Sequence, residues 1–159
     1  MVTVIAMQTE TCLLDEIQRE NCIITGAGAL NVINSLKGMD LDTPILNIGY
    51  AGSNSLPIGS RVRVGKVMLY HPNVDIDEPV YVLDGKINCY TSNDFVLSTE
   101  IREPCVFDME LAFIMALGFR NVISEKVVSD NLSLKEFSNT RSEWERWNGQ
   151  GRESACKRN

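Results

Sequence analysis

The sequence lacks any uninterrupted apolar run near the length of about 20 residues that a membrane-spanning helix requires. It also lacks a basic segment ahead of its first apolar residues, so residues 1–4 do not have the pattern of a secretory signal. We therefore expect neither a membrane partner nor export from the cytoplasm.

Cysteine and histidine do not occur in the arrangements that metal or redox chemistry requires. The five cysteines are odd in number and share no pair spacing that suits a zinc site or a redox motif. Reduced thiols in a cytoplasmic protein are expected, with no metal and no cofactor. His71 is the only histidine and has no visible partner in the sequence, which favours a structural or exposed position over a role as general base.

Positive charge is in short supply, because 15 Lys and Arg stand against 21 Asp and Glu. With a formal net charge of −6, binding to nucleic acid is not expected to be the main activity. A length of 159 residues allows one domain with a core but is short for two. We predict a single domain over residues 1–148 and a flexible tail over residues 149–159, where apolar periodicity is absent.

Three strand-like runs each end in a polar or glycine-containing turn. The runs and their turns are residues 2–6 with 8–10, residues 44–49 with 50–54, and residues 121–128 with Ser129 and Asp130. Because α/β proteins place their ligands at strand ends, we expect these turns to form one crevice.

Other patterns predict the elements between these runs. Residues 22–24 read as a strand and residues 29–36 as a helix after a glycine turn, while residues 56–70 form a second β region. Asp84-Gly85 lies between two strand-like pieces and predicts a hairpin. Residues 108–119 predict a buried helix. Ser133 and Glu136 form a capping box that predicts a helix containing Phe137, Trp144 and Trp147.

Glu10, Glu110 and Asp130 are the candidates for chemistry, since each lies next to an apolar element that could face a common pocket. Carboxylates in a semi-enclosed cleft can divide the roles of acid and base, as glycoside cleavage through an oxocarbenium-like state requires. An acid in the first turn of a helix, as Glu110 would be, also suits the helix dipole without any function.

A series of short motifs resembles the nucleoside phosphorylase and nucleosidase superfamily, most closely its methylthioadenosine/S-adenosylhomocysteine nucleosidase branch. The motifs keep the family's order up to about residue 137, and they are Ala6-Met7-Gln8-Thr9-Glu10, Thr25-Gly26-Ala27-Gly28, Leu46-Asn47-Ile48-Gly49-Tyr50-Ala51-Gly52, Leu69-Tyr70-His71, Thr91-Ser92-Asn93-Asp94-Phe95-Val96, Phe107-Asp108-Met109-Glu110-Leu111-Ala112 and Val127-Val128-Ser129-Asp130.

The resemblance implies a three-layer α/β/α fold with a central twisted mixed sheet. Only a short segment separates Glu10 from the Thr25-Gly26 turn, where the family threads additional strands, so we expect the N-terminal half to be abbreviated. The implied activity is hydrolysis of the N-glycosidic bond of a purine nucleoside such as methylthioadenosine, S-adenosylhomocysteine or adenosine.

The resemblance also assigns two catalytic roles. Asp130 matches the general acid that protonates the purine at N7, and Ser129 matches the residue that orients this acid. Glu10 matches the acid that orients and activates water. A carboxylate suits that task because the electrophile is already cationic and needs only a positioned nucleophile.

The remaining matched positions would bind the substrate. Glu110 matches the glutamate that holds the ribose hydroxyls, with Met109 packing on the sugar and Phe95 stacking on the base. Gly49 and Tyr50 lie at the turn beside the ligand, although Tyr50 is bulky where the family has a small residue. Tyr70 and His71 match a contact with a neighbouring subunit, which implies a homodimer.

Two alternatives stay open. The family's phosphorylases carry an arginine at the position of Asn47, so hydrolysis is favoured, but phosphate could be held by backbone amides of the Gly26 or Gly49 turn with Arg61 or Arg63. A shortened module that binds a nucleoside without cleaving it is the other alternative.

Overall fold

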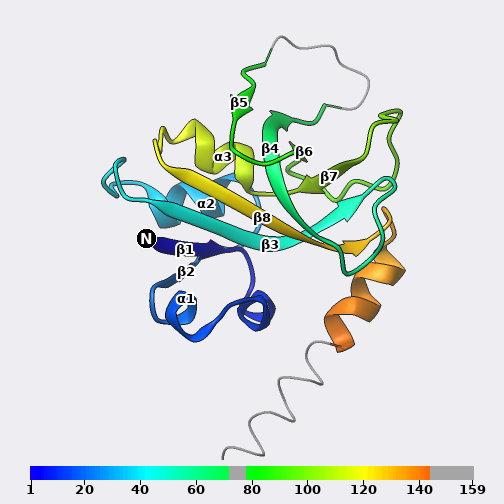
Figure 1. Cartoon of the computed structure of the whole chain (residues 1–159), viewed down its shortest axis with the longest axis horizontal. Helices are drawn as coiled ribbons and strands as arrows, with labels where there is room; N and C mark the ends of the chain where they lie inside the picture. The colour runs from blue at the N-terminus through cyan, green and yellow to red at the C-terminus, as the bar shows by residue number, and fades with distance from the viewer. Residues whose placement is uncertain (72–77, 144–159) are drawn as a thin grey trace, which may run out of the picture.

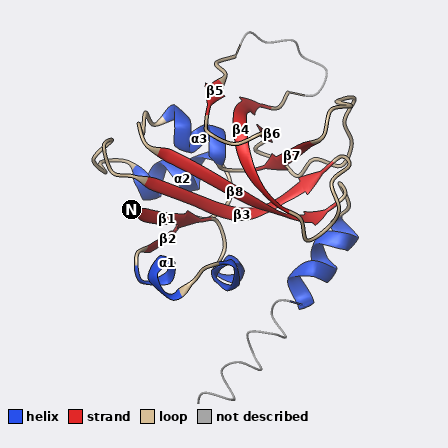
Figure 2. Cartoon of the chain, in the orientation of Figure 1, coloured by secondary structure: helices blue, strands red, loops and turns tan. Residues whose placement is uncertain are grey.

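The computed structural model describes residues 1–71 and 78–143 and is built on a twisted mixed sheet of eight strands (Figure 1, Figure 2). The strands are β1 (Val2–Ile5), β2 (Cys22–Ile24), β3 (Ile45–Ser53), β4 (Arg61–Leu69), β5 (Tyr81–Val82), β6 (Ile87–Thr91), β7 (Cys105–Asp108) and β8 (Val122–Asp130). The expected α/β fold with a central mixed sheet is confirmed. The predicted tail and both tryptophans lie outside the described residues, and the prediction of one domain over residues 1–148 stays a prediction.

The strand pairings combine an open edge with a closed ring. β2, β1 and β3 are parallel neighbours, and β3 pairs in parallel with β8 along most of its length. β8 then pairs with β4, β4 with β6, β6 with β7, and β7 returns to β3 at Gly52 and Ser53. This ring brings the second half of β3 together with the ends of β7 and β8.

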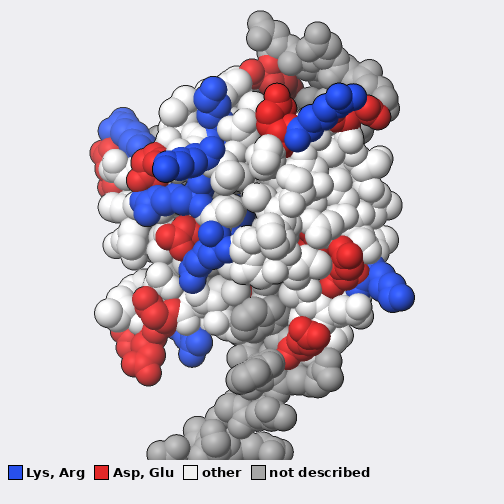
Figure 3. Space-filling model, turned by 45° about the vertical axis from the view of Figure 1, so that its right-hand side comes forward, with Lys and Arg blue, Asp and Glu red and all other residues white. Residues whose placement is uncertain are grey.

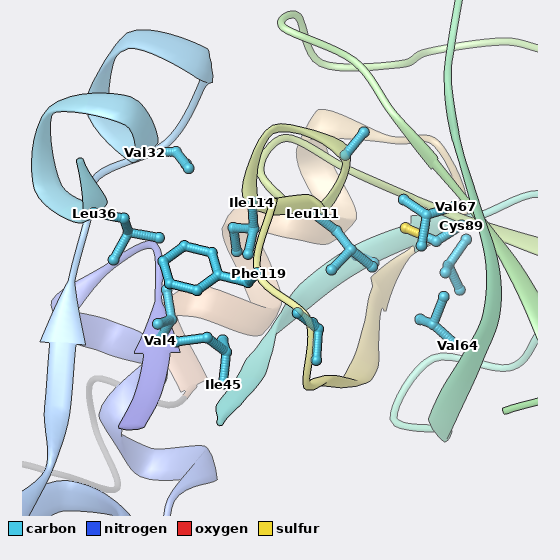
Figure 4. Close-up of a cluster of buried hydrophobic side chains, with 14 of the residues drawn as sticks. Val4, Val32, Leu36, Ile45, Val64, Val67, Cys89, Leu111, Ile114 and Phe119 are labelled. Atoms are coloured by element: carbon cyan, nitrogen blue, oxygen red, sulfur yellow. The ribbon is translucent and has the colours of Figure 1, made fainter. Parts of the chain in front are cut away.

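Helices cover both faces of the sheet. On one face, α2 (Ala29–Leu36) and α3 (Leu111–Ala116) bury apolar side chains against the strands, with Leu36, Ile114 and Phe119 packed over Val4 and Ile45 (Figure 4). On the other face, a smaller cluster of Ile5, Leu14, Leu46 and Ile48 packs beside the 3-10 helix η1 (Gln8–Leu13) and α1 (Glu16–Glu20). Among residues 1–71 and 78–143, no helix combines the length and apolarity needed to cross a membrane.

The hairpin predicted around Gly85 is wrong. β5 and β6 flank this turn but pair on opposite sides of β4, antiparallel and parallel respectively. The turn packs directly on β4, because a Cβ atom added to Gly85 would lie 2.3 Å from the carbonyl oxygen of Arg63. Gly85 therefore allows the chain to cross β4. The sequence pattern alone predicts a tight hairpin turn at the same residue.

One predicted boundary and one predicted cap also change. Residues 50–53 are strand and not turn, because β3 keeps its pairing with β8 beyond Gly49 and then adds β7. The helix expected after Ser133 is present over residues 134–143. The Ser133 hydroxyl accepts from the backbone N–H of Glu136 at 3.3 Å, but the Glu136 carboxylate accepts from Asn131 N–H at 2.7 Å instead of from Ser133.

Candidate active site

A cavity of about 180 Å³ opens where β3 passes the ends of β7 and β8. Its lining is mostly apolar but includes five carboxylates, from Glu10, Asp94, Asp108, Glu110 and Asp130. No lysine or arginine occurs among the described residues that line it. The cavity therefore favours a neutral or positively charged ligand over an anion.

Glu10 is held by backbone groups from two elements. The N–H groups of Ala6 and Met7 donate to Oε2 at 2.8 and 2.9 Å, and the Tyr50 N–H on β3 donates to Oε1 at 2.8 Å. The side chain is 2% exposed. A carboxylate has about four acceptor positions, so one position on Oε1 is left for another donor.

Burial raises the pKa of Glu10 above its ordinary value, although the three backbone N–H donors act in the opposite direction. A raised pKa brings the carboxylate closer to the strength that a general base needs near neutral pH. Fixed geometry and raised basicity together suit this group to hold and activate a small nucleophile.

Asp130 ends β8 and is fully buried beside Ser129. The Ser129 hydroxyl donates to Oδ2 at 2.6 Å, and the Ser133 N–H donates to Oδ1 at 3.2 Å. Leu132 follows in the left-handed region with a φ of 62°, so the chain turns sharply after Asp130. The turn is held by Asn131, whose amide nitrogen donates to the carbonyl oxygens of Ser53 and Leu56.

Of the three candidate acids, Glu110 has the weakest hydrogen-bond support. It stands at the N-terminal boundary of α3, and the Met109 N–H donates to its Oε2 at 3.3 Å. Burial, reinforced by the negative charge of Asp108, raises the pKa of Glu110 to about 8. Glu110 can therefore change its charge near neutral pH.

A buried ion pair that sequence reasoning missed lies behind these acids. Lys126 Nζ on β8 is 2.6 Å from Asp108 Oδ2 on β7, and both side chains are fully buried. The contact is an ion pair and not a hydrogen bond, because the angles between the ammonium and the carboxylate are unsuitable for one. The one available signal was a lysine inside the β-branched run of residues 122–128, where a buried strand would otherwise be apolar.

The other predicted site residues fall into two neighbouring hollows. Tyr50, Phe95, Met109 and Ser129 line the cavity with the three candidate acids. Gly49 lies behind it, where an added Cβ would be 3.0 Å from Glu10 Oε1. Phe137 also lines the cavity, with its ring centroid 5.5 Å from that of Phe95; its place in a predicted helix was recognised but not its place in the site.

Tyr70 and His71 line an adjoining groove of about 490 Å³ and not the cavity itself. The groove shares Asp94, Phe95 and Val96 with the cavity, so both hollows lie beside the same segment. The sequence shows no partner for His71, and the structure supplies one, because its Nε2 lies 3.2 Å from the Glu78 carboxylate. The roles assigned to these residues by the resemblance stay predictions.

The basic residues considered for phosphate binding lie elsewhere. Arg61 pairs with Glu125 at 2.8 Å and Arg63 pairs with Asp84 at 2.7 Å, both at the surface. On the face shown in Figure 3, Lys and Arg side chains stand beside Asp and Glu, with further acids gathered below them. Asn47 is buried in the sheet, where its side chain accepts from Ser124 Oγ and donates to Val4 O.

The sheet and its covering helices form a fold that this chain shares with nucleosidases, enzymes that hydrolyse N-glycosidic bonds. A methylthioadenosine nucleosidase of Chlamydia trachomatis has a TM-score of 0.71 at 14% identity, over 91% of this chain and 90% of that one. The 5′-methylthioadenosine/S-adenosylhomocysteine nucleosidase of Neisseria meningitidis, in complex with methylthio-immucillin-A, has a TM-score of 0.66 at 18% identity, over 90% of each chain.

A third protein with this fold is the futalosine hydrolase of Helicobacter pylori, with a TM-score of 0.65 at 13% identity over 91% of this chain and 94% of that one. No protein-family model and no curated protein sequence matches the chain. The resemblance inferred from the motifs is thus confirmed at the level of the fold.

Proposed function

We propose that the protein is a purine nucleosidase that uses water to cleave the bond between C1′ of ribose and N9 of the base. The observation that carries this proposal is the gathering of Glu10, Glu110 and Asp130 around one cavity, although these acids lie far apart in the sequence. Methylthioadenosine, S-adenosylhomocysteine and adenosine are the candidate substrates. Solved structures with this fold include nucleosidases with methylthioadenosine bound, which supports this choice.

Asp130 is proposed as the general acid. The electron pair of the breaking C1′–N9 bond passes to the purine, and a proton from Asp130 to N7 lets the base leave as a neutral species. The hydroxyl of Ser129 and the N–H of Ser133 support this role, because they fix both oxygens of the carboxyl group. Phe95 and its partner Phe137 offer the aromatic surface on which the base stacks.

Glu10 is proposed to hold the attacking water. Three of its acceptor positions are filled by backbone N–H groups, and the remaining position on Oε1 accepts a hydrogen bond from water. As the water oxygen bonds to C1′, its proton passes to Glu10. Proton loss from Glu10 to solvent and proton uptake by Asp130 then restore the resting site.

Glu110 is proposed to accept hydrogen bonds from the ribose hydroxyls, with Met109 packing against the sugar. The carboxylates around the cavity favour the positive charge that develops on the sugar as the base departs. The same charges disfavour phosphate. Because Arg61 and Arg63 are paired at the surface away from the cavity lining, phosphorolysis through them has no support.

The direct test is release of free base from methylthioadenosine, S-adenosylhomocysteine, adenosine and inosine, measured chromatographically with and without phosphate. We expect release without phosphate from at least one of these nucleosides and no acceleration when phosphate is added. Release that depends on phosphate would identify a phosphorylase. Binding in a calorimeter without any product would identify a nucleoside-binding module.

We further propose that the enzyme is a cytoplasmic homodimer whose single catalytic domain spans residues 1–148. The groove lined by Tyr70 and His71 adjoins the cavity, and this position supports a second copy beside the site. The free thiols of Cys12, Cys22, Cys89 and Cys105 support a reducing compartment. Sedimentation at twice the 17.8 kDa of one chain is the expected result for the dimer.

A further inference from the structure

Lys126 is a fully buried ionisable group to which the proposed reaction gives no task. Its side chain has no exposed surface, and Nζ has no hydrogen-bond partner of good geometry among the described residues. Burying a lysine in this way is costly unless its charge is compensated. Its compensation is Asp108, 2.6 Å away on a strand that is not a neighbour of β8 in the sheet.

We propose that Lys126 is a positioning residue: its buried ammonium pairs with Asp108 and thereby holds, and electrostatically tunes, the segment that presents Glu110 to the ribose. The inference rests on the proposed function, because it gives Glu110 a substrate to bind. Lys126 itself does not line the cavity.

The mechanical link runs through Asp108 into the first turn of α3. Besides the lysine, Asp108 accepts hydrogen bonds from the Thr91 hydroxyl at 2.5 Å and from the Leu111 N–H at 3.0 Å. The Thr91 oxygen in turn accepts from the Ala112 N–H at 2.9 Å. Two backbone donors at the start of α3 are therefore tied to the ion pair, and Glu110 immediately precedes them.

The electrostatic link is set by the groups that surround Glu110. Asp108 on β7 and Glu10 on η1 oppose its negative charge, while Lys126 on β8 favours it. Cys89 on β6 faces the same pair, but burial raises its pKa well above the ordinary value and leaves the thiol neutral. Lys126 is thus the positive group that offsets part of the repulsion that Asp108 and Glu10 exert on the Glu110 carboxylate.

The ionisation of Glu110 matters because a carboxylate accepts two hydroxyl hydrogen bonds, whereas the protonated group has less acceptor capacity. Removing the lysine charge should therefore weaken ribose binding at neutral pH, and raising the pH should restore it. A lysine that only fills space would give no such recovery.

The test compares Lys126→Met, which keeps the aliphatic stem, with Lys126→Arg, which keeps the charge. Carbon NMR of the Glu110 carboxyl group follows its titration in the free protein around the native value of about 8. We expect Lys126→Met to raise the pKa of Glu110 by on the order of one pH unit or more, Lys126→Arg to leave it near the native value, and Asp108→Asn to lower it. If Lys126→Met does not fold, Lys126→Gln replaces it in the titration. Gln also removes the positive charge but keeps a hydrogen-bond donor toward Asp108.

Base release is then measured with the same variants across pH. Lys126→Met should raise KM at neutral pH on the order of tenfold, with a smaller change in kcat and with recovery at higher pH. Thr91→Val is the matched control, since it loosens the same network without changing a charge, and should lower Tm without moving the Glu110 titration. An unchanged Glu110 titration in both Lys126→Met and Lys126→Gln would overturn the proposal. Because the NMR titration needs no turnover, its outcome is separate from failure of the nucleosidase assignment.

Discussion

The candidate acids differ most in the number of donors that each receives. Glu10 accepts hydrogen bonds from three backbone N–H groups, and Asp130 accepts them from a hydroxyl and an N–H. Glu110 accepts one hydrogen bond from an N–H, at 3.3 Å. Donors to a carboxylate stabilise its charge, while burial alone destabilises it. Three side chains in one cavity are thereby prepared for different tasks.

Replacing Asp130 with Asn tests the acid at this scale. An amide keeps the contacts with Ser129 and Ser133, so we expect the free energy of unfolding to change by less than about 1 kcal/mol. It cannot supply the proton, so kcat should fall by about 10²- to 10⁴-fold. Asp94→Asn is the matched control, since it removes an exposed acid of the same cavity, and should change kcat by less than about threefold. Equal losses in the two variants would remove Asp130 from the mechanism.

Glu110 predicts an unusual dependence of stability on pH. Its pKa is about 8 in the folded protein against an ordinary 4.5, so between these values the folded state binds the proton and the unfolded state releases it. Its contribution to stability is complete below pH 4.5 and is lost as the pH rises to about 8, with a slope of at most about 1.4 kcal/mol per pH unit. Urea unfolding of the native protein and Glu110→Gln across this range should show that the variant lacks this component.

At the scale of elements, the site depends on a contact between η1 and β3. Tyr50 donates its N–H to Glu10, and its hydroxyl lies 3.5 Å from the Sγ of Cys12, two residues after Glu10. Gly49 leaves room for the Glu10 carboxylate, because a Cβ atom there would lie only 3.0 Å from Oε1. The strand and the 3-10 helix together fix the proposed water-binding group.

Gly49→Ala should therefore displace Glu10 by a few tenths of an ångström and lower kcat about tenfold, since catalysis is sensitive to small changes in orientation. The free energy of unfolding should fall by about 1–3 kcal/mol from overpacking. The same substitution in a Glu10→Gln background identifies the route. If Gly49 acts through Glu10, the substitution adds little further loss of kcat there, whereas an undiminished loss would place its effect elsewhere.

At the scale of the whole molecule, charge separates the cavity from the surface. Arg61, Arg63 and Arg120 form exposed ion pairs, while acids line the cavity and the buried Lys126 stands behind it. Exposed pairs of this kind each contribute less than about 1 kcal/mol to stability. The separation of acids in the cavity from bases at the surface therefore affects the choice of ligand more than the stability of the fold.

This distribution predicts discrimination against nucleotides. Adenosine 5′-monophosphate would bring a phosphate to a cavity with five carboxylates and, among its described lining residues, no cation. We expect kcat/KM for the monophosphate to be lower than for adenosine by a hundredfold or more, which is about 2.7 kcal/mol. Methylthioadenosine controls for the size of the 5′ substituent without charge. Comparable cleavage of all three would show that the acids do not select the substrate.

Several parts of the fold were accessible to sequence reasoning because they depend on neighbouring residues. The α2 helix follows a glycine turn, and Ser133 marks the start of the last described helix. The prediction failed at Gly85, since a turn residue does not reveal whether the flanking strands pair with each other or with a third strand. β7 was likewise not recognised as a strand, because its four residues lead directly into the apolar α3 pattern.

The sequence by itself determined the alternation of strands and helices and the identity of the acids at their ends, because apolar periodicity and turn chemistry act over a few residues. Only the tertiary structure decided which acids share a cavity, that Lys126 and Asp108 are paired, and that Arg61 and Arg63 are bound to surface partners. These contacts join residues distant along the chain. They exist only after β3, β7 and β8 are paired, and no local pattern encodes that pairing.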